Sequence, residues 1–272
     1  MRIMLAATLV VLATACGTET APGPAPLVPA GRLVDLTHPF DAEAVYWPTA
    51  TPFELERVAH GTMPAGYFYS ANRFRAAEHG GTHIDAPIHF SEGRPSVDQI
   101  PVGQLIRPGV LIDVSRRCLA DRDYLVGIED IEDWEKRNGR LPDGAIVLLR
   151  TGFGRFWPDR ERYLGTAERG ADAVSELHFP GLDPAAARWL AAERSIAAVG
   201  LDTASIDHGP STTFESHVAL FEHDIPALEN VANLHELPER GFTVMALPMK
   251  IAGGSGGPTR IVAVIADPGA DP

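Results

Sequence analysis

Three histidines and one aspartate lie within a short segment of the sequence, HGGTHIDAPIHF, at positions 79–90. These residues, His79, His83, Asp85 and His89, all occupy odd positions, so an extended chain would present them on one face. The even positions from Thr82 onward are mostly apolar and would face a core. Imidazole and carboxylate groups without a thiolate suit Zn(II) or Mn(II). The segment therefore predicts a strand with a divalent metal site on one face.

A helix would also bring two imidazoles to one metal, because His79 and His83 would lie one turn apart. Gly80 and Gly81 disfavour that helix by about 1 kcal/mol each, and Pro87 by about 3 kcal/mol. A fully extended chain would separate the two histidines by roughly 13 Å, at about 3.3 Å per residue. We therefore expect the glycines to bend the chain. Hydrogen-bonded core histidines are the alternative, and each would need a buried partner.

This segment resembles the signature HxGTHxDxPxHF of the cyclase family, which includes bacterial kynurenine formamidases and isatin hydrolases. Two other stretches resemble the family: His217 with Glu229 and Asn230, and the run from Leu247 to Pro258 with its glycine-rich end. The resemblance covers roughly residues 30–266. It implies a single α/β domain with the swivelling β/β/α fold, assembled as a homodimer or homotetramer.

The resemblance also implies roles for individual residues. Five would be metal ligands: His79, His83, Asp85, His217 and Glu229. His89 would be the general base. The ligands would hold one ion with open positions, or two ions about 3.5 to 4 Å apart bridged by carboxylates. Family members line the substrate pocket with an aromatic residue before a proline, and Trp47 with Pro48 matches that place. Phe68 and Phe74 are further candidates for this pocket.

The predicted chemistry is hydrolysis of an amide C–N bond. A divalent cation lowers the pKa of bound water from 15.7 to about 7, which supplies a nucleophile. His89 would take the water's proton and deliver it to the leaving nitrogen. The substrate would be a small aromatic amide, either cyclic, as in isatin, or a formamide, as in N-formylkynurenine. Export and the extra segment 151–181 favour the cyclic amide. A metal-binding envelope protein is the non-enzymatic alternative, and it would not need His89.

Composition limits the domain count and the class of partner. The chain has 272 residues, of which 45% are hydrophobic, so it can bury one sizeable core, and residues 32–272 are expected to form a single domain. The formal net charge of −13 argues against nucleic acid, which requires a basic surface. Of the two cysteines, Cys16 and Cys118, the latter is expected to be a small buried residue rather than a nucleophile.

The N-terminus has the features of an export signal. Residues 1–16 contain Arg2, a short apolar run and small residues before Cys16. Residues 17–31 are rich in Pro, Ala, Gly and Thr, which is typical of a disordered tether. Cys16 would carry a lipid, as in bacterial lipoproteins, although Ala13 to Ala15 also fits an ordinary signal peptidase. We expect a location in the bacterial cell envelope, lipid-anchored or periplasmic, with membrane contact only through that lipid.

Alternating strand and helix patterns predict the elements that position these residues. Strands are expected at 32–37, 53–58, 67–78, 109–114, 145–149, 196–201, 225–230, 243–247 and 260–266, and helices at 128–137, 184–194 and 212–221. Residues 151–181 show no sustained period and predict a long loop or lid, with His178 at its surface. Asp202 is a candidate for orienting a ligand histidine. The glycine-rich turn at 253–257 either approaches the substrate or turns tightly.

Overall fold

The computed structural model describes residues 31–266. The predicted export signal, Cys16 and nearly all of the predicted tether lie outside the described residues. The β-strands are β1 Gly31–Asp35, β2 Glu54–Thr62, β3 Phe68–Arg75, β4 His83–Asp85, β5 Ile106–Asp113, β6 Leu125–Val126, β7 Ile146–Arg150, β8 Gly181–Leu182, β9 Ala198–Leu201, β10 Ala227–Glu229, β11 Phe242–Pro248 and β12 Gly256–Ala266. The α-helices are α1 Val102–Leu105, α2 Ser115–Ala120, α3 Ile128–Asn138, α4 Arg160–Leu164, α5 Pro184–Glu193 and α6 Glu215–Phe221. Short 3₁₀ turns are η1 Pro87–His89, η2 Val97–Gln99, η3 Phe153–Phe156, η4 Asp172–Glu176 and η5 Leu234–Glu236.

One mixed sheet organises the fold, with strand order β1-β12-β11-β5-β7-β9-β10-β4. The last strand, β4, also pairs with β12, so the strands from β12 to β4 close into a barrel-like ring. The long strand β12 makes this possible, because residues 262–266 pair with β1 and residues 256–258 pair with β4. The ring places β4, which carries His83 and Asp85, between two strands from the C-terminal part of the chain.

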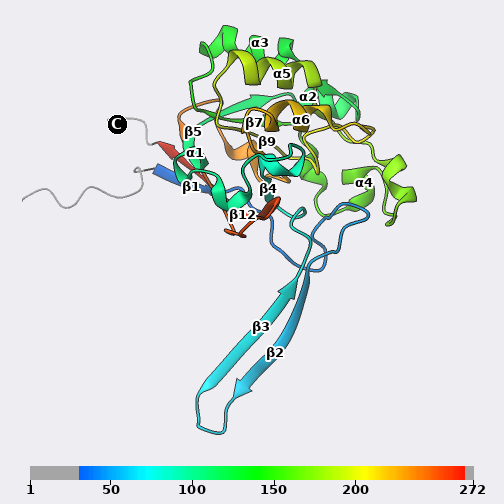
Figure 1. Cartoon of the computed structure of the whole chain (residues 1–272), viewed down its shortest axis with the longest axis vertical. Helices are drawn as coiled ribbons and strands as arrows, with labels where there is room; N and C mark the ends of the chain where they lie inside the picture. Colours follow the sequence, from blue (N-terminus) through cyan, green and yellow to red (C-terminus); the bar gives the residue numbers. More distant parts are fainter. Residues whose placement is uncertain (1–30, 267–272) are drawn as a thin grey trace, which may run out of the picture.

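Two hydrophobic clusters lie on opposite faces of the strands, as the alternation of side chains requires. In β7, Ile146 and Leu148 belong to one cluster, and Val147 and Leu149 belong to the other. The second of these clusters includes Trp134 of α3 and Leu190 of α5. Helices α3, α5 and α6 cover this face of the sheet (Figure 1). Among residues 31–266, none of the helices combines the length and the apolar character needed to cross a membrane.

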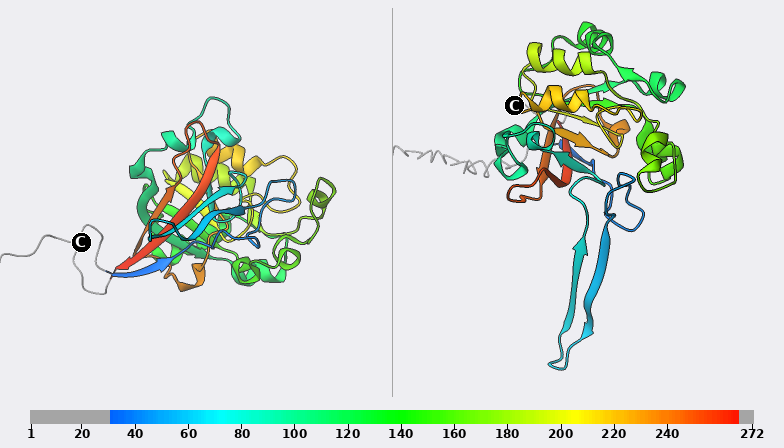
Figure 2. Two further views of the ribbon diagram at one scale, coloured as in Figure 1. Left: turned by 90° about the horizontal axis from the view of Figure 1, so that it is seen from below. Right: turned by 45° about the vertical axis from the view of Figure 1, so that its right-hand side comes forward.

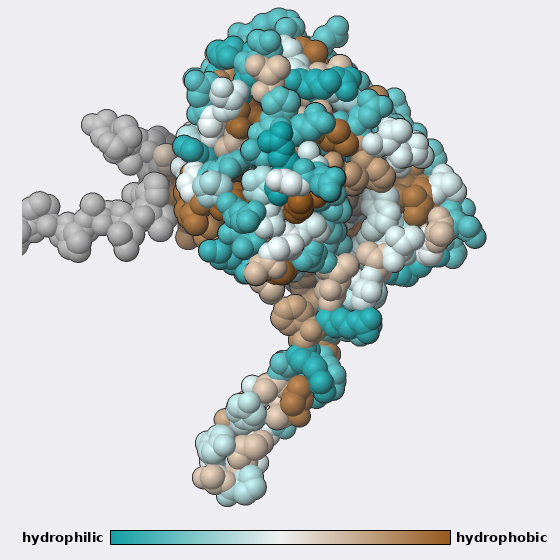
Figure 3. Space-filling view, viewed as in Figure 1, coloured by the Kyte–Doolittle hydropathy of each residue, from teal (hydrophilic) through white to brown (hydrophobic). Residues whose placement is uncertain are grey.

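Strands β2 and β3 form a separate two-stranded arm that projects far from the domain (Figures 1 and 2). Both strands are largely exposed, including the side chains of Leu55, Phe68 and Phe74. On this view of the surface, apolar and polar residues alternate along the arm (Figure 3). The two strands were predicted, and β3 leads into the central segment as expected, whereas the projection of the pair away from the domain (Figure 1) was not predicted.

Most predicted elements are found within one to four residues of their expected bounds, including the strands around the central segment. Helix α5 begins as its sequence predicts, because the Asp183 carboxylate accepts hydrogen bonds from the N–H groups of Ala185 and Ala186. Cys118 is fully buried, as expected. Burial raises the pKa of its thiol.

Three expectations need correction. Helix α6 starts at Glu215 rather than Thr212, because Phe214 adopts the left-handed conformation just before it. The strand expected through the central segment ends at Asp85, since Pro87 has no N–H to donate and begins the turn η1 instead. Residues 151–181 are not an irregular loop, because they contain η3, α4 and η4 and bury Phe153, Tyr163 and Phe179. Their role as a lid stays a prediction.

Candidate metal centre

Three elements bring the predicted ligands together. Strand β4 carries His83 and Asp85, and its antiparallel neighbour β10 places Glu229 directly opposite His83. Helix α6 adds His217 in its first turn. These four residues are all at most 4% exposed. The fold therefore gathers ligands that are more than a hundred residues apart in sequence into one buried cluster.

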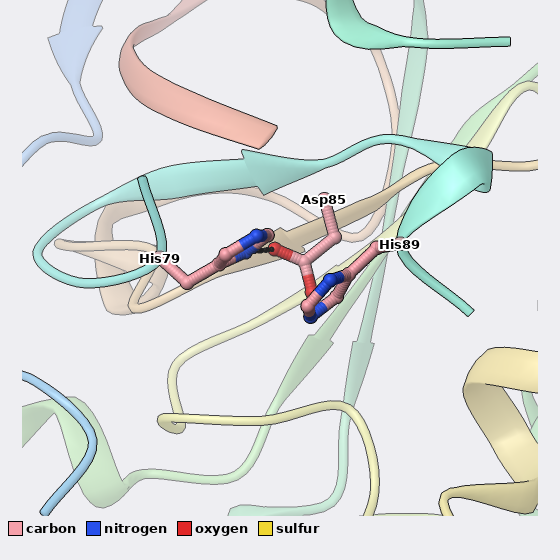
Figure 4. Close-up of side chains that lie close together, drawn as sticks. All are labelled: His79, Asp85 and His89. Carbon is pink, nitrogen blue, oxygen red and sulfur yellow. Dashed lines mark hydrogen bonds and ion pairs between the residues drawn. The ribbon is translucent and has the colours of Figure 1, made fainter. Parts of the chain in front are cut away.

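A glycine bend brings the fifth predicted ligand, His79, back to the cluster. Gly80 and Gly81 have φ angles of 148° and 59°, and the latter lies in the left-handed region that disfavours side chains. A Cβ atom on Gly80 would collide with the ring of Tyr46, and one on Gly81 with the ring of Phe40. The bend predicted from these glycines is therefore confirmed, and His79 Nδ1 lies 2.7 Å from Asp85 Oδ1 (Figure 4).

The His83 ring shows that the cluster fits a cation. Its Nδ1 atom lies 2.9 Å from the carbonyl oxygen of Gly81, so Nδ1 donates and Nε2 carries a lone pair. This Nε2 atom is buried without a hydrogen-bond partner, 3.1 Å from Asp85 Oδ1 and 3.4 Å from Glu229 Oε2. Three lone pairs that face one another repel unless a positive charge lies between them. A divalent metal supplies that charge.

His217 is oriented in the same way by a different partner. Its Nδ1 atom lies 2.5 Å from Asp207 Oδ2. Its Nε2 atom therefore points into the cluster, where it lies 3.2 Å from Asp85 Oδ2 and 3.1 Å from Glu229 Oε1. The Asp207 carboxylate also accepts hydrogen bonds from the N–H groups of Ser216 and His217. Asp207 thus fixes both the start of α6 and the ring orientation of His217.

Burial and neighbouring charges shift the pKa values of the residues in the cluster. Burial lowers the pKa of His83, but the nearby carboxylates outweigh burial and raise the pKa to about 9. Burial raises the pKa of Asp85, but the surrounding imidazoles outweigh burial and hold the pKa well below its usual value. Burial and the charge of Asp85 raise the pKa of Glu229. The cluster therefore attracts positive charge, and a metal ion would displace the protons that otherwise supply it.

His89 lies beside the cluster on η1 rather than on β4, which corrects its expected place on the same strand face. Its ring stacks on the ring of His79 with centroids 3.8 Å apart and planes inclined by 16° (Figure 4). Burial, together with the neighbouring imidazoles, lowers the pKa of His89 to about 4. A ring with this pKa is neutral at pH 7 and can accept a proton.

A cavity of about 300 Å³ opens onto the cluster. His79, His83, Asp85, His89, His217 and Glu229 line its polar end. Trp47, Phe90 and Phe214 form an aromatic wall, with the ring of Phe214 5.0 Å from that of Phe90 and 6.4 Å from that of Trp47. The cavity can therefore bind an aromatic molecule with one polar end at the ligands.

The structure separates the predicted pocket residues. Trp47 lies in the aromatic wall, whereas Phe68 and Phe74 lie on the arm, 63% and 53% exposed, and are not among the residues that line the cavity of the same chain. The arm carries them away from the domain. Phe90 and Phe214 take their place in the wall. Phe90 was expected to pack in the core, and Phe214 could not be identified because no sequence signal marks its left-handed backbone, with φ of 50°.

The candidate for orienting a ligand histidine was also wrong. The Asp202 carboxylate accepts hydrogen bonds from the N–H groups of Thr151, Gly152 and Gly154. It therefore holds the start of segment 151–181, and Asp207 orients His217 instead. His178 lies at the surface, as expected, and its Nδ1 atom is 2.8 Å from Asp123 Oδ2.

Comparisons with known proteins show the family to which the chain belongs. The sequence model of the cyclase family matches residues 34–208. The isatin hydrolase of Roseibium aggregatum is 31% identical over 208 residues, which cover 74% of this chain and 76% of that protein. The kynurenine formamidase of Bacillus cereus is 29% identical over 234 residues, or 84% of this chain and 95% of that protein. The solved structure of isatin hydrolase A from Ralstonia solanacearum superposes with a TM-score of 0.78 at 33% identity, covering 86% of this chain and 92% of that one.

Proposed function

The chain belongs to the cyclase family and is a metal-dependent amide hydrolase, and we propose that it opens a cyclic amide fused to an aromatic ring. The observation that carries this proposal is the cavity, in which an aromatic wall faces the ligand cluster and His89. A flat aromatic ring against Trp47 and Phe214 would direct its amide carbonyl toward the ligands. The similarity to isatin hydrolases in sequence and in structure supports the same class of substrate.

Each group of residues in the site would have a different role in hydrolysis. A bound divalent cation supplies Lewis acidity to a carbonyl oxygen and lowers the pKa of a coordinated water. His89 is neutral at pH 7 and takes the proton from the attacking water. The same ring, now protonated, returns the proton to the amide nitrogen as the C–N bond breaks. Phe90, Phe214 and Trp47 exclude water from the aromatic side of the substrate and hold its carbonyl in place.

Both carboxylates of the cluster face more than one histidine. Asp85 directs Oδ1 toward His79 and His83 and Oδ2 toward His217. Glu229 likewise directs Oε2 toward His83 and Oε1 toward His217. Together with the three histidines, these carboxylates would hold one or two divalent ions, which would supply Lewis acidity. Zn(II) and Mn(II) both suit the nitrogen and oxygen ligands. Elemental analysis of the purified protein would give the metal and its stoichiometry.

Turnover of isatin and N-formylkynurenine, each with Zn(II) or Mn(II), tests the substrate proposal. We expect kcat/KM for isatin to exceed that for the formamide, and Phe214→Ala to raise KM for isatin because the aromatic wall is lost. Preference for N-formylkynurenine would assign the chain to the formamidases instead. A metal-loaded protein that turned over neither amide would support the metal-binding alternative.

We further propose that the protein assembles as a homodimer or homotetramer through its arm. An isolated two-stranded hairpin is only marginally stable in water, and this one exposes Leu55, Phe68, Tyr69 and Phe74. Every copy of the chain carries the same surface, so a second copy can cover it symmetrically. The mass of the purified protein by light scattering would test the assembly, and a monomer at all concentrations would contradict it.

Export to the cell envelope is also proposed, on the sequence of residues 1–16. Fractionation should recover the protein outside the cytoplasm, and labelling with a fatty-acid analogue should mark the parent but not Cys16→Ala. Catalysis by a chain that starts near Pro29 should equal that of the full chain, because the tether is not expected to contribute to the core. An uncleaved chain in the cytoplasm would contradict the proposal.

A further inference from the structure

The glycine-rich turn before β12 reaches the metal centre through one side chain. Ser255 Oγ lies 2.8 Å from His79 Nε2, although the two residues are 176 positions apart. On its other side, Ser255 Oγ lies 2.7 Å from Glu78 Oε2, which also accepts a hydrogen bond from the backbone N–H of Ser255 at 3.0 Å. The carbonyl oxygen of Ser255 accepts from the N–H of Ala86, one residue after the ligand Asp85. The turn is thus joined to the central segment at both ends.

The two partners of the Ser255 hydroxyl decide where the proton of His79 lies. A hydroxyl has one proton to donate, and the Glu78 carboxylate can only accept it. The hydroxyl must therefore accept from His79, which requires the proton on Nε2. The lone pair of His79 then lies on Nδ1, which is the atom that faces Asp85 Oδ1. Glu78 thereby fixes the tautomer of His79 through Ser255.

His79 differs in this respect from the other two histidines of the cluster. His83 and His217 are held through Nδ1, by the Gly81 carbonyl and by Asp207, and both present Nε2. His79 presents Nδ1 and therefore needs a partner on the opposite atom of the ring. Since neither β4 nor α6 supplies one, the partner comes from the turn before β12.

The glycines on either side of Ser255 make this contact possible. A Cβ atom on Gly254 would lie 2.8 Å from Glu78 Oε1, and one on Gly256 would lie 2.5 Å from the carbonyl oxygen of Ile84 and 2.6 Å from His79 Cε1. These distances are shorter than a Cβ atom tolerates, so a side chain at either position would displace Glu78, His79 or the neighbouring strand β4. The turn was expected to approach the substrate or simply to reverse the chain. Its glycines instead make room for the Glu78 and His79 side chains.

We infer that Glu78 and Ser255 are positioning residues that hold His79 with its Nδ1 lone pair directed at the metal. This inference rests on the proposed metal centre and explains the glycine-rich turn, which the hydrolytic mechanism does not use. Partners that orient a metal-binding histidine typically contribute about 10- to 100-fold to metal affinity. Ser255 touches neither the aromatic wall nor His89, so its loss should weaken metal binding without a direct effect on the substrate pocket.

A metal titration of the full chain tests the inference. Affinity for Co(II) is measured from its visible absorption, and affinity for Zn(II) by competition with a chelator, after the resident metal has been removed. Ser255→Ala and Glu78→Ala should each weaken binding by about 10- to 100-fold. Ser255→Thr and Glu78→Gln should stay close to the parent, because the first keeps the hydroxyl and the second keeps an oxygen that accepts its proton. Ring-nitrogen NMR of the Zn(II) protein should show His79 protonated on Nε2 in the parent and in these two conservative variants.

Asp98→Ala is the matched control. Asp98 Oδ1 accepts from the N–H of Gly253 at 2.9 Å, so this change loosens the same turn without touching Glu78, Ser255 or His79. Its metal affinity should equal that of the parent. If Asp98→Ala weakened binding as much as Ser255→Ala, or if Ser255→Ala bound metal like the parent, the positioning role would be overturned. A parent chain that bound neither Co(II) nor Zn(II) would overturn the metal centre itself, and with it this inference.

Discussion

The metal centre and the arm lie next to each other in the sequence and differ in almost every physical respect. The arm ends at Arg75, and the centre begins at His79. The ligands from β4, β10 and α6 are buried and held by hydrogen bonds from other segments. The arm contacts mainly itself, and most of its side chains are exposed. The candidate ligands are thus buried and held in place within one chain, whereas the arm exposes its side chains to solvent.

The two regions should therefore respond differently to substitution. Removing one member of the centre leaves the remaining lone pairs or charges buried without a partner, which is costly. Changing an exposed side chain of the arm costs the folded domain little, because water already solvates it. We therefore expect substitutions at the centre to act on metal and chemistry, and substitutions on the arm to act on assembly.

Loss of His217 should have the largest effect. His217→Ala and His83→Ala should each release metal and abolish turnover, because each ring faces both carboxylates of the cluster. Thermal stability should fall with the metal, since a bound ion stabilises only the folded state. His223→Ala is the control, because His223 lies just after α6 and its ring hydrogen-bonds to the Ala219 carbonyl rather than to the cluster. Metal content and melting temperature decide the matter, and full occupancy in His217→Ala would show that the second half of the centre is misassigned.

His89→Ala should separate chemistry from binding within the centre. If His89 transfers protons and is not a ligand, kcat should fall by about 10² to 10⁴ while metal content stays near that of the parent. His79→Ala should lose metal and activity together, although the two rings are stacked. Metal stoichiometry and single-turnover rates measure both effects. Metal loss from His89→Ala would make His89 a ligand, and unchanged turnover would remove it from the mechanism.

The bend and the shared face of His83 and Asp85 could be predicted from the sequence because both depend on local chemistry. Glycines at 80 and 81 and the spacing of His83 and Asp85 predict the bend and the shared face without knowledge of the rest of the fold. The family resemblance added His217 and Glu229. Their approach to β4 depends on the closure of the sheet, which no short pattern reveals.

Residues that act through long-range contacts could not be predicted in the same way. Asp202 and Asp207 lie in one loop and have the same chemistry, yet only the packing of α6 against that loop brings Asp207 to His217. Phe214 reaches the cavity through an unusual backbone conformation, and Ser255 reaches His79 across the sheet. The projection of the arm away from the domain could not be predicted, because strand patterns predict pairing but not where a hairpin points.

His38 lies in neither region, and its replacement should have an intermediate effect, on the pH dependence of the unfolding free energy. It is mostly buried and stacks on Trp157 at 4.0 Å, but its Nε2 atom has no hydrogen-bond partner. Burial, only partly offset by the charge of Asp35, lowers its pKa from 6.5 to about 4. Below pH 6.5 the unfolded chain binds a proton that the folded chain does not, so stability falls until about pH 4 and is constant below it.

At pH 5 this linkage should cost about 2 kcal/mol relative to pH 7.5, from 1.36 kcal/mol per pH unit below 6.5. His38→Phe keeps the ring stack and removes the titrating group, so its unfolding free energy should fall less over the same range. The other histidines contribute equally to both proteins, and the difference between the two urea titrations isolates His38. Parallel pH dependences would show that His38 titrates normally in the folded chain.

The smallest effect on the folded domain, and the sharpest contrast with the centre, is expected on the arm. Leu55 and Phe74 lie opposite each other on one face, and Phe68 projects on that same face nearer the tip. Leu55→Ser with Phe68→Ser should change the unfolding free energy of the monomer by no more than about 0.5 kcal/mol for each substitution. Metal content should equal that of the parent, since no ligand lies on the arm.

The assembly should nevertheless weaken, because a second copy that buries this face gains about 25 cal/mol for each Å² of apolar surface. Light scattering over a range of concentrations measures the assembly, and Glu56→Gln, on the opposite face of the arm, is the control. Unchanged mass in the double variant, or metal loss from it, would mean that the arm and the centre are not the independent regions that their burial indicates.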